Sequence, residues 1–333
     1  EHVRRAFERV FRRTSPRGLP YIGAGDWNDG LSAAGLEEKG ESIWLAQFLA
    51  GCLGEWAVIH ERTGRAPFAA DYAKRRARLV DAINEHGWDG AWYWRATLDD
   101  GTKLGSATSD RGRIYLNAQT WAILNDIAPP DRAAACMKAV REHLVSEAGA
   151  LLLAPAYDMP DERIGYITRY APGLRENGGV YTHAATWAIA AACKAKDEEL
   201  VSLLLRAIDP TNKDPERYWA EPYVLPGNVD GPQSPWYGRA GWTWYTGSAS
   251  WLHRIVTERV IGVRPEWDGL RVDPCLPPEW SHARMLRPFR GATYEIRIER
   301  GGKPGITLDG KTIEGSILPL PKRGERHDVV VRI

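Results

Sequence analysis

The hydrophobic pattern of the chain changes once, near residue 262, and this change limits the folds that the chain can adopt. Before it, apolar side chains recur at helical spacing, and residues 40–63 place them on more than one face, as in a helix packed between neighbours. After it, short alternating segments such as ATYEIRIERGG and turns such as Asp309-Gly310 indicate β-strands. The sequence predicts a mainly α protein with a helical domain over 1–261 and a small β-domain over 262–333.

The helical part is expected to carry long loops on its scaffold. Further helices are predicted over residues 1–13, 70–87, 114–127, 130–146, 184–207 and 243–261. Their order resembles stacked helical hairpins. The connections at 88–113, 154–182 and 217–242 are longer than ordinary loops, and long ordered loops on a helical scaffold usually build a site.

The aromatic composition favours a protein that handles carbohydrate. The chain of 333 residues has 15 Trp against 5 Phe and 3 Met, so its aromatic side chains are weighted toward indoles. An indole stacks on the apolar face of a pyranose and also donates a hydrogen bond. Core packing alone rarely selects such a mixture.

Charge and cysteine usage narrow the partners and the compartment. A net charge of +1 gives no long-range field for nucleic acid or an anionic membrane, and no apolar run approaches the roughly 20 residues of a bilayer span. The first residues, EHVRRAFERVFRR, lack the apolar core of a secretory signal, and a chain without an initial Met is expected to be a fragment or a processed chain. Cys52, Cys136, Cys193 and Cys275 lack metal-ligand spacing, which predicts buried thiols in a cytoplasmic protein with no metal site.

The segment GLPYIGAGDWNDGL, residues 18–31, is the strongest candidate for chemistry. It places Asp26 and Asp29 on either side of Trp27 in a glycine-punctuated loop. Cleavage of a glycosidic bond needs a carboxylic acid against the bridging oxygen, and a sugar ring stacks on an indole. Asp and Asn beside Gly are equally ordinary in turns and helix caps, so this loop alone leaves both interpretations open.

Four other segments combine polar side chains, glycine and aromatics. They are IYLNAQTW (114–121), RENGGVYTHAATW (175–187), AEPYVLPGN (220–228) and GRAGWTWYTGSASWLHR (238–254). Together with the GDWND loop, and in this order, they resemble glycoside hydrolase family 94, the inverting disaccharide phosphorylases, from about residue 14 to about 280. The resemblance implies the C-terminal part of an (α/α)6 barrel followed by a small β-sandwich tail of jelly-roll type.

The same resemblance assigns roles to the residues of the loop and of a phosphate site. The family's general acid falls on Asp29, with Trp27 at the sugar subsite, and burial against the indole would raise the pKa of a carboxyl there. Asp26 is expected to orient this substrate-binding loop by accepting backbone hydrogen bonds. His183 falls on the phosphate-binding histidine, and Thr246 and Gly247 on the phosphate loop, where glycine admits the backbone and threonine gives a hydroxyl.

The acceptor side of the cleft is expected at Arg175 and Glu176. Cellobiose-acting relatives carry a lysine where Arg175 stands and a glutamine after the EPYV segment, so the sequence looks closer to the cellobionic acid and β-1,2-glucan branches. Arg169 and Arg175 together would suit a carboxylate. The alternative is that Arg169 pairs on the surface with Asp158, Asp161 or Glu162.

Two polar residues could have either a substrate-binding or a structural role. Gln119 and Glu221 are candidates for contacts to sugar hydroxyls, or else buried hydrogen-bonding struts.

The resemblance implies phosphorolysis with inversion. A β-glucosidic disaccharide or oligosaccharide would give α-glucose 1-phosphate, with phosphate as co-substrate, no other cofactor, and an acidic acceptor such as gluconate. The remainder of a longer polypeptide or a second chain, as in a homodimer, would complete the barrel. Two other functions stay open: a non-catalytic carbohydrate-binding module, and an inverting hydrolase with Glu176 or Glu221 as base.

Overall fold

The computed structural model describes all residues from Glu1 to Ile333, and the chain divides into two compact units. The first consists of Glu1–Ala191 and Ala207–Ser248, and the second of Ala192–Arg206 and Ala249–Ile333. The strands of the tail begin at β10, directly after residue 262. The assignment of catalytic loops to 1–261 and of a separate β-domain to 262–333 stays a prediction.

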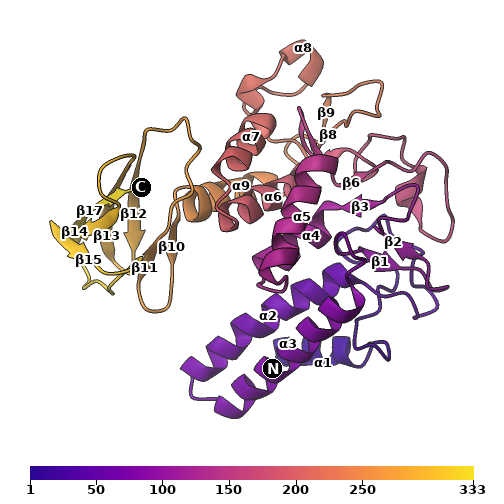
Figure 1. Cartoon of the computed structure of the whole chain (residues 1–333), viewed down its shortest axis with the longest axis horizontal. Helices are drawn as coiled ribbons and strands as arrows, with labels where there is room; N and C mark the ends of the chain where they lie inside the picture. Colours follow the sequence, from indigo (N-terminus) through magenta and orange to yellow (C-terminus); the bar gives the residue numbers. More distant parts are fainter. The chain divides into compact units, whose positions relative to one another are not determined.

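Helices dominate the chain before the tail (Figure 1). They are α1 (His2–Phe11), α2 (Ile43–Arg62), α3 (Ala66–His86), α4 (Leu116–Leu124), α5 (Pro130–His143), η1 (Tyr166–Arg169), α6 (Thr182–Lys194), α7 (Glu198–Ile208), η2 (Pro210–Asn212), α8 (Pro215–Tyr218), α9 (Ser248–Ile255) and η3 (Val256–Val260). The loops between them contain two-residue strands: β1 (Ala96–Thr97), β2 (Lys103–Leu104), β3 (Ile114–Tyr115), β4 (Val145–Ser146), β5 (Gly149–Ala150), β6 (Leu153–Ala154), β7 (Val180–Tyr181), β8 (Asn228–Val229) and β9 (Ala240–Gly241).

The single helix expected over 184–207 is two helices, α6 and α7. Lys196 adopts a left-handed conformation with φ 58°, and its N–H bonds to the carbonyl of Cys193 while the N–H of Asp197 bonds to that of Ala192. This is a Schellman motif, which usually contains glycine at the left-handed position. Asp197 then caps α7 by accepting a hydrogen bond from the N–H of Leu200 at 2.9 Å.

The helix expected over 243–261 begins later, at Ser248, and its last turn, η3, is π-helical. Residues 242–247 before it are irregular instead, and Trp242 and Trp244 have φ 57° and 66°. Backbone angles of this kind cannot continue a right-handed helix.

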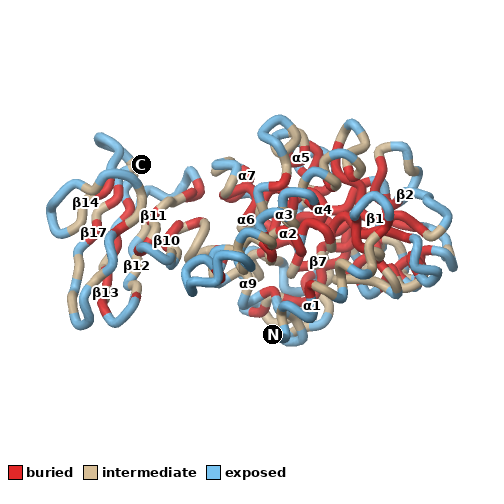
Figure 2. Tube along the Cα trace, turned by 90° about the horizontal axis from the view of Figure 1, so that it is seen from below, coloured by how far each residue is buried: buried red, intermediate tan, exposed pale blue.

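The tail consists of β10 (Val263–Pro265), β11 (Leu270–Val272), β12 (His282–Phe289), β13 (Ala292–Glu299), β14 (Gly305–Leu308), β15 (Lys311–Ile313), β16 (Ile317–Leu318) and β17 (Arg326–Arg332). Alternate residues of β13 are buried, as Figure 2 shows along the strand. The expected turn at Asp309-Gly310 is confirmed, because Leu308 pairs with Lys311 and both turn residues have positive φ.

The strand order departs from a jelly roll. One sheet has the order β10-β11-β16 and the other β12-β13-β17-β14-β15. In the second sheet β13 and β17 pair in parallel, whereas jelly rolls are antiparallel. The jelly-roll connectivity expected for the tail is therefore wrong at this pair.

Helix α2 is an exception to the expectation that no apolar segment reaches the length of a bilayer span. Its residues Ile43–Arg62 are long and apolar enough by length and composition, with a mean hydropathy of 1.2. Core helices of soluble proteins pass the same measure. In this structure α2 packs against α3 and α4, and Figure 1 shows α2 and α3 as an antiparallel pair.

A hydrophobic cluster supports the loop that contains Asp26 and Asp29. Its members come from the loop and the residues just after it, from in or near β1, β2, β3 and β6, and from the segment around η1. They are Ile22, Leu31, Ala34, Ala96, Leu98, Leu104, Tyr115, Leu153, Tyr157, Ile164 and Ile167. The cluster holds both ends of the loop against the rest of the first unit.

Candidate active site

Asp26 is anchored by a buried arginine. The side chains of Asp26 and Arg95 are 2% and 0% exposed, and the guanidinium bonds both carboxylate oxygens, with 2.8 Å from Nη1 to Oδ2. Ser42, which caps α2, donates to the same Oδ2 at 2.6 Å, and the N–H of Asn28 donates to Oδ1 at 3.0 Å. Both oxygens are thus engaged within the chain.

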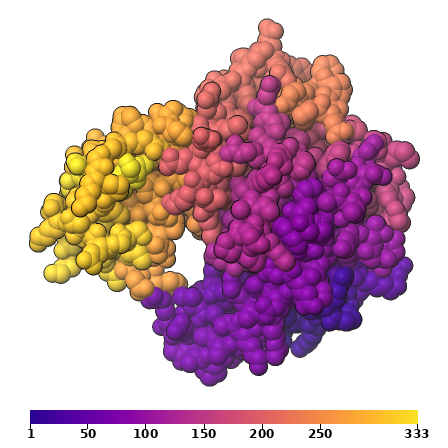
Figure 3. Space-filling view, in the orientation of Figure 1, coloured from indigo at the N-terminus to yellow at the C-terminus, as the bar shows by residue number.

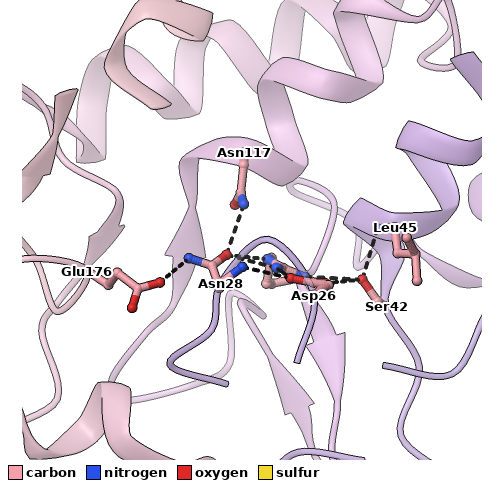
Figure 4. Close-up of polar contacts among 7 residues, drawn as sticks. Asp26, Asn28, Ser42, Leu45, Asn117 and Glu176 are labelled. Carbon is pink, nitrogen blue, oxygen red and sulfur yellow. Dashed lines mark hydrogen bonds and ion pairs between the residues drawn. The ribbon is translucent and has the colours of Figure 1, made fainter. Parts of the chain in front are cut away.

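Asn28 connects this pair to the rest of the site (Figure 4). Its Oδ1 accepts hydrogen bonds from Arg95 and, at 3.0 Å, from Nδ2 of Asn117 on α4. Its own Nδ2 donates to Oε1 of Glu176 at 2.9 Å. The side chain of Asn28 is fully buried and fixes the loop with respect to two other segments of the chain.

Glu176 is the carboxyl with the most shifted ionisation in this region. It is 8% exposed, and burial raises its pKa to about 6, although the hydrogen bond from Asn28 works against the shift. The charge of nearby Asp29 raises the pKa further. The opposite side of Glu176 is closely packed, since a Cβ at Gly30 would lie 2.8 Å from Oε2 of Glu176 and 2.7 Å from Cβ of Ile167.

Asp29 itself is exposed, so the burial expected for this carboxyl is wrong in this chain. Burial raises the pKa of the Tyr166 and Tyr181 hydroxyls, and the nearby charges of Glu176 and Asp29 raise it further. Asp29 thus faces solvent beside a buried acid and two phenols.

Trp27 lies in a cluster of aromatic rings with the residues that follow ENGG. Its ring centroid is 5.5 Å from that of His183, 5.3 Å from Tyr181 and 4.7 Å from Trp187. The indole of Trp44 on α2 is 6.4 Å away. The structure therefore brings the Asp29 loop and His183 together through this indole.

The turn at 246–248 lies directly against the same histidine. A Cβ built on Gly247 would be 3.3 Å from Cε1 of His183. The N–H of Ser248 donates to Oγ1 of Thr246 at 3.1 Å, which leaves the hydroxyl hydrogen of Thr246 for another acceptor. Burial lowers the pKa of His183, so the ring is neutral near pH 7 and offers an N–H rather than a full charge.

The two arginines expected at the acceptor side differ in their surroundings. Arg169 is exposed and pairs with Glu162 at 2.6 Å, which is the surface ion pair expected as the alternative to carboxylate binding. The guanidinium of Arg175 stacks 4.0 Å from the ring centroid of Trp242 and 5.2 Å from that of Tyr170, and no carboxylate of the chain pairs with it. The structure thus separates a surface ion pair from a stacked cation without a counterion.

Gln119 is a structural strut. It is fully buried, its Nε2 donates to the carbonyls of Tyr93 and Tyr115 at 2.7 and 3.1 Å, and its Oε1 accepts from the N–H of Tyr93. The prediction that this side chain contacts substrate is therefore wrong. Glu221 is partly exposed. A hydrogen bond from its own backbone N–H, and one from Nε1 of Trp244 at 2.9 Å, lower its pKa.

Arg95, Asn117 and Asn28 are site residues that sequence reasoning missed. Arg95 is 69 positions from Asp26, in a loop rich in Trp and Tyr, and nothing in the local sequence pairs it with a particular carboxylate. Asn28 lies inside the DWND motif, and its role could have been predicted, because an amide between two aspartates can bridge a carboxylate and a cation.

The first unit therefore holds an exposed carboxylate near a buried acid, with an indole and an imidazole beside the same loop. Residues 1–262 match the model of the Glycosyl hydrolase 94 superfamily, catalytic domain. The chain belongs to this family.

Two curated relatives illustrate the similarity. Solabiose phosphorylase of Paenibacillus borealis is 37% identical over 315 residues, which cover 92% of this chain and 41% of that protein. Cyclic β-(1,2)-glucan synthase NdvB of Rhizobium meliloti is 38% identical over 312 residues, which cover 92% of this chain and 11% of that protein. The chain therefore spans about two fifths of the first relative and about a tenth of the second.

A solved structure shares the fold at low identity. The GH78 family rhamnosidase of Bacillus sp. GL1 has a TM-score of 0.61 and 15% identity, and the match covers 99% of this chain and 31% of that one. At this identity the similarity concerns the fold alone.

Proposed function

We propose that this chain is the part of an inverting glycoside phosphorylase that holds its general acid and its phosphate turn. The observation that carries the proposal is the contact of Trp27 with His183, and of His183 with Gly247. The loop that carries Asp29 thus lies beside the histidine and the turn that we propose as the phosphate site. The (α/α)6 barrel and a β-glucosidic substrate belong to the same proposal.

In this mechanism Asp29 protonates the bridging oxygen while inorganic phosphate attacks the anomeric carbon from the opposite face. The C–O bond to the leaving sugar breaks, a C–O bond to phosphate forms, and inversion at a β-glucoside gives α-glucose 1-phosphate. One carboxylate suffices because phosphate replaces the base-activated water of an inverting hydrolase. A bound sugar that covers Asp29 would supply the desolvation that the uncovered carboxyl lacks.

His183, Thr246 and Gly247 are proposed to bind the phosphate. A neutral imidazole N–H, a free hydroxyl hydrogen and a backbone approachable at glycine are the donors that an oxyanion needs. Asp26 acts as a positioning residue, since Arg95, Ser42 and Asn28 engage its carboxylate.

We propose that Arg175 reads an acidic acceptor such as gluconate. Its guanidinium is oriented by stacking on Trp242 and has no counterion in the chain, so a substrate carboxylate would complete its pairing. Glu176 lies next to it and is proposed to bind acceptor hydroxyls. A β-1,2-glucan end is the matching neutral acceptor, and the relative named as a cyclic β-(1,2)-glucan synthase supports its inclusion.

The remainder of a longer polypeptide, or a second chain, is proposed to complete the site. Around the Trp27 cluster, four buried polar atoms have no hydrogen-bond partner in the chain: Nε1 of Trp44, Nε1 of Trp121, Oγ1 of Thr182 and Oδ1 of Asn117. Such groups each cost about 1–3 kcal/mol, so partners from substrate, from the rest of a longer polypeptide or from a second chain are expected. A cytoplasmic location is part of the proposal, supported by four free thiols.

The decisive experiment measures phosphate release from α-glucose 1-phosphate with added glucose, sophorose, gluconate or glucuronate, using the chain alone and the complete protein. Turnover that depends on Asp29 supports the proposal. Hydrolysis of a β-glucoside without phosphate would indicate the hydrolase, for which Glu176, with its pKa of about 6, is the candidate second carboxyl. Glycan binding without turnover in the complete protein would indicate a binding module.

A further inference from the structure

The segment from residue 217 to residue 245 exposes an unusual set of side chains. Its large exposed apolar residues are all aromatic, and we name them the aromatic strip: Trp219, Tyr223, Trp236, Trp242, Trp244 and Tyr245. Their exposures range from 41% to 80%. The segment, salmon to orange in Figure 3, lies on the visible surface of the space-filling view. Exposed indoles at this density mark a binding surface.

The backbone of the strip is held in conformations that bulky residues rarely adopt. Trp219, Trp242 and Trp244 have φ 59°, 57° and 66°, in the left-handed region. A tryptophan in this region is a steric outlier, and such outliers persist where the surrounding structure enforces them, commonly at ligand-binding sites. The strain thus gives a second observation, independent of exposure.

Neighbouring polar groups fix the rings. The guanidinium of Arg239 stacks 4.0 Å from the ring centroid of Trp219 and 5.7 Å from that of Trp236. Nε1 of Trp244 donates to Glu221, and the rings of Trp244 and Tyr223 are 6.4 Å apart. Rings oriented before binding lose little conformational entropy when a ligand stacks on them.

Four rings of the strip, those of Trp242, Tyr245, Trp244 and Tyr223, form a series that begins at the proposed acceptor side. The ring of Trp242 stacks on the guanidinium of Arg175, and its centroid is 5.9 Å from that of the Tyr245 ring. From there the chain leads within two residues to Trp244 and its partners Tyr223 and Glu221. A ligand that starts at Arg175 would therefore meet further stacking rings.

We propose that the aromatic strip binds the sugar units of an oligosaccharide acceptor beyond the one next to the reacting bond. The direction of this chain of subsites rests on the proposed function. Pyranose rings stack on exposed indole and phenol faces through their apolar C–H groups, while the polar atoms of Glu221 and Arg239 lie within reach of the hydroxyls. The protein then acts on oligosaccharides and discriminates by length.

The test measures binding to the full chain by isothermal titration calorimetry with linear β-1,2-glucooligosaccharides of two to six units and with cellohexaose. We expect affinity to rise with length. Tyr223→Ala and Trp236→Ala should each weaken the hexasaccharide about two- to tenfold, the range for one stacked aromatic pair, and leave the disaccharide unchanged. Both residues have ordinary backbone angles, so these variants test stacking without removing strain. Trp244→Ala extends the test to a left-handed position.

Trp267→Ala is the matched control, because Trp267 is 50% exposed and lies outside the strip. It should bind every oligosaccharide as the unaltered chain does. Equal affinity for two and six units, or strip variants that bind the hexasaccharide as the unaltered chain does, would overturn the proposal. Length-dependent binding with no turnover in the complete protein would instead defeat only the proposed phosphorolysis.

Discussion

The side-chain amide of Asn28 donates a hydrogen bond of 2.9 Å to the carboxyl of Glu176, 148 residues further along the chain. Asn28 directly precedes Asp29, and Glu176 directly follows Arg175. The bond therefore couples the position of the proposed proton donor to that of the proposed acceptor subsite. The ring contacts of Trp27 with Tyr181 and His183 join the same two segments.

Replacement of Asp29 by Asn should remove turnover and spare binding. An amide has the size of the carboxyl but no transferable proton, so we expect a loss of about 10²- to 10⁴-fold in phosphorolysis by the complete protein. Titration of oligosaccharide should give the same affinity as before. Asp110→Asn, at an exposed loop position, is the control and should keep full activity. Retained turnover in Asp29→Asn would exclude Asp29 as the acid.

Glu176→Gln should raise stability above pH 6. The folded pKa is about 6 against an ordinary value of 4.5, so the unfolded state ionises first and the free energy of unfolding falls as pH rises between these values. The full penalty is about 2 kcal/mol. Glutamine keeps an oxygen for Asn28 and stays neutral. Urea denaturation at pH 4 should show no gain in the free energy of unfolding, and at pH 7.5 it should show nearly the full gain. Glu85→Gln is the control, because the side chain of Glu85 is 74% exposed, and it should show no gain at either pH.

Loss of Arg95 should destabilise the fold more than loss of any surface arginine. Arg95→Met leaves the carboxylate of Asp26 buried without a counterion, which typically costs about 3–5 kcal/mol. The exposed pair of Arg163 and Asp161 is the comparison, and Arg163→Met should change the free energy of unfolding by less than about 1 kcal/mol. Adding Asp26→Asn to Arg95→Met should recover part of the loss. If both variants lowered the free energy of unfolding by the same amount, the buried pair would stabilise the fold no more than the exposed one.

Variants of Arg175 and Arg169 should differ in their kinetics with acidic acceptors. Arg175→Ala is expected to lower kcat/KM for gluconate about ten- to hundredfold, as for a lost hydrogen bond to a charged group, with a smaller loss for glucose. Arg169→Ala should stay within about twofold for both, because its guanidinium pairs with Glu162 at the surface. Equal losses for gluconate and glucose in Arg175→Ala would show that it does not read a carboxylate.

His183→Ala should raise the KM for phosphate much more than the KM for the sugar. The buried ring is neutral near pH 7, so its contribution to an oxyanion is one N–H bond, worth about tenfold. Initial rates at varied phosphate and saturating disaccharide provide the measurement. A change confined to the KM for the sugar would instead assign His183 to the donor subsite.

The sequence predicted the fold best where local chemistry decides the structure. The apolar stretch at 40–63 contains α2, and the Asp309-Gly310 hairpin is present, because periodicity and turn residues act over short distances. The break between α6 and α7 escaped prediction because a lysine, not a glycine, occupies the left-handed position of the Schellman motif.

The candidate site was predictable in its motifs but not in its contacts. The DWND loop and His183 stand out by composition, and their rings are 5.5 Å apart in the structure. Arg95 could not be assigned, since its partner is set by tertiary packing rather than by spacing. Gln119 had the composition of a ligand residue, yet its hydrogen bonds are used by the backbone of Tyr93 and Tyr115.

The tight packing around Gly30 bears on directed evolution of this loop. A side chain at this position would overlap Ile167 and the carboxyl of Glu176, at 2.7 and 2.8 Å. In a randomised library of this loop, most members altered at position 30 would displace a carboxyl from another segment before they changed any chemistry. Retuning of specificity by mutagenesis is best begun with that glycine held constant.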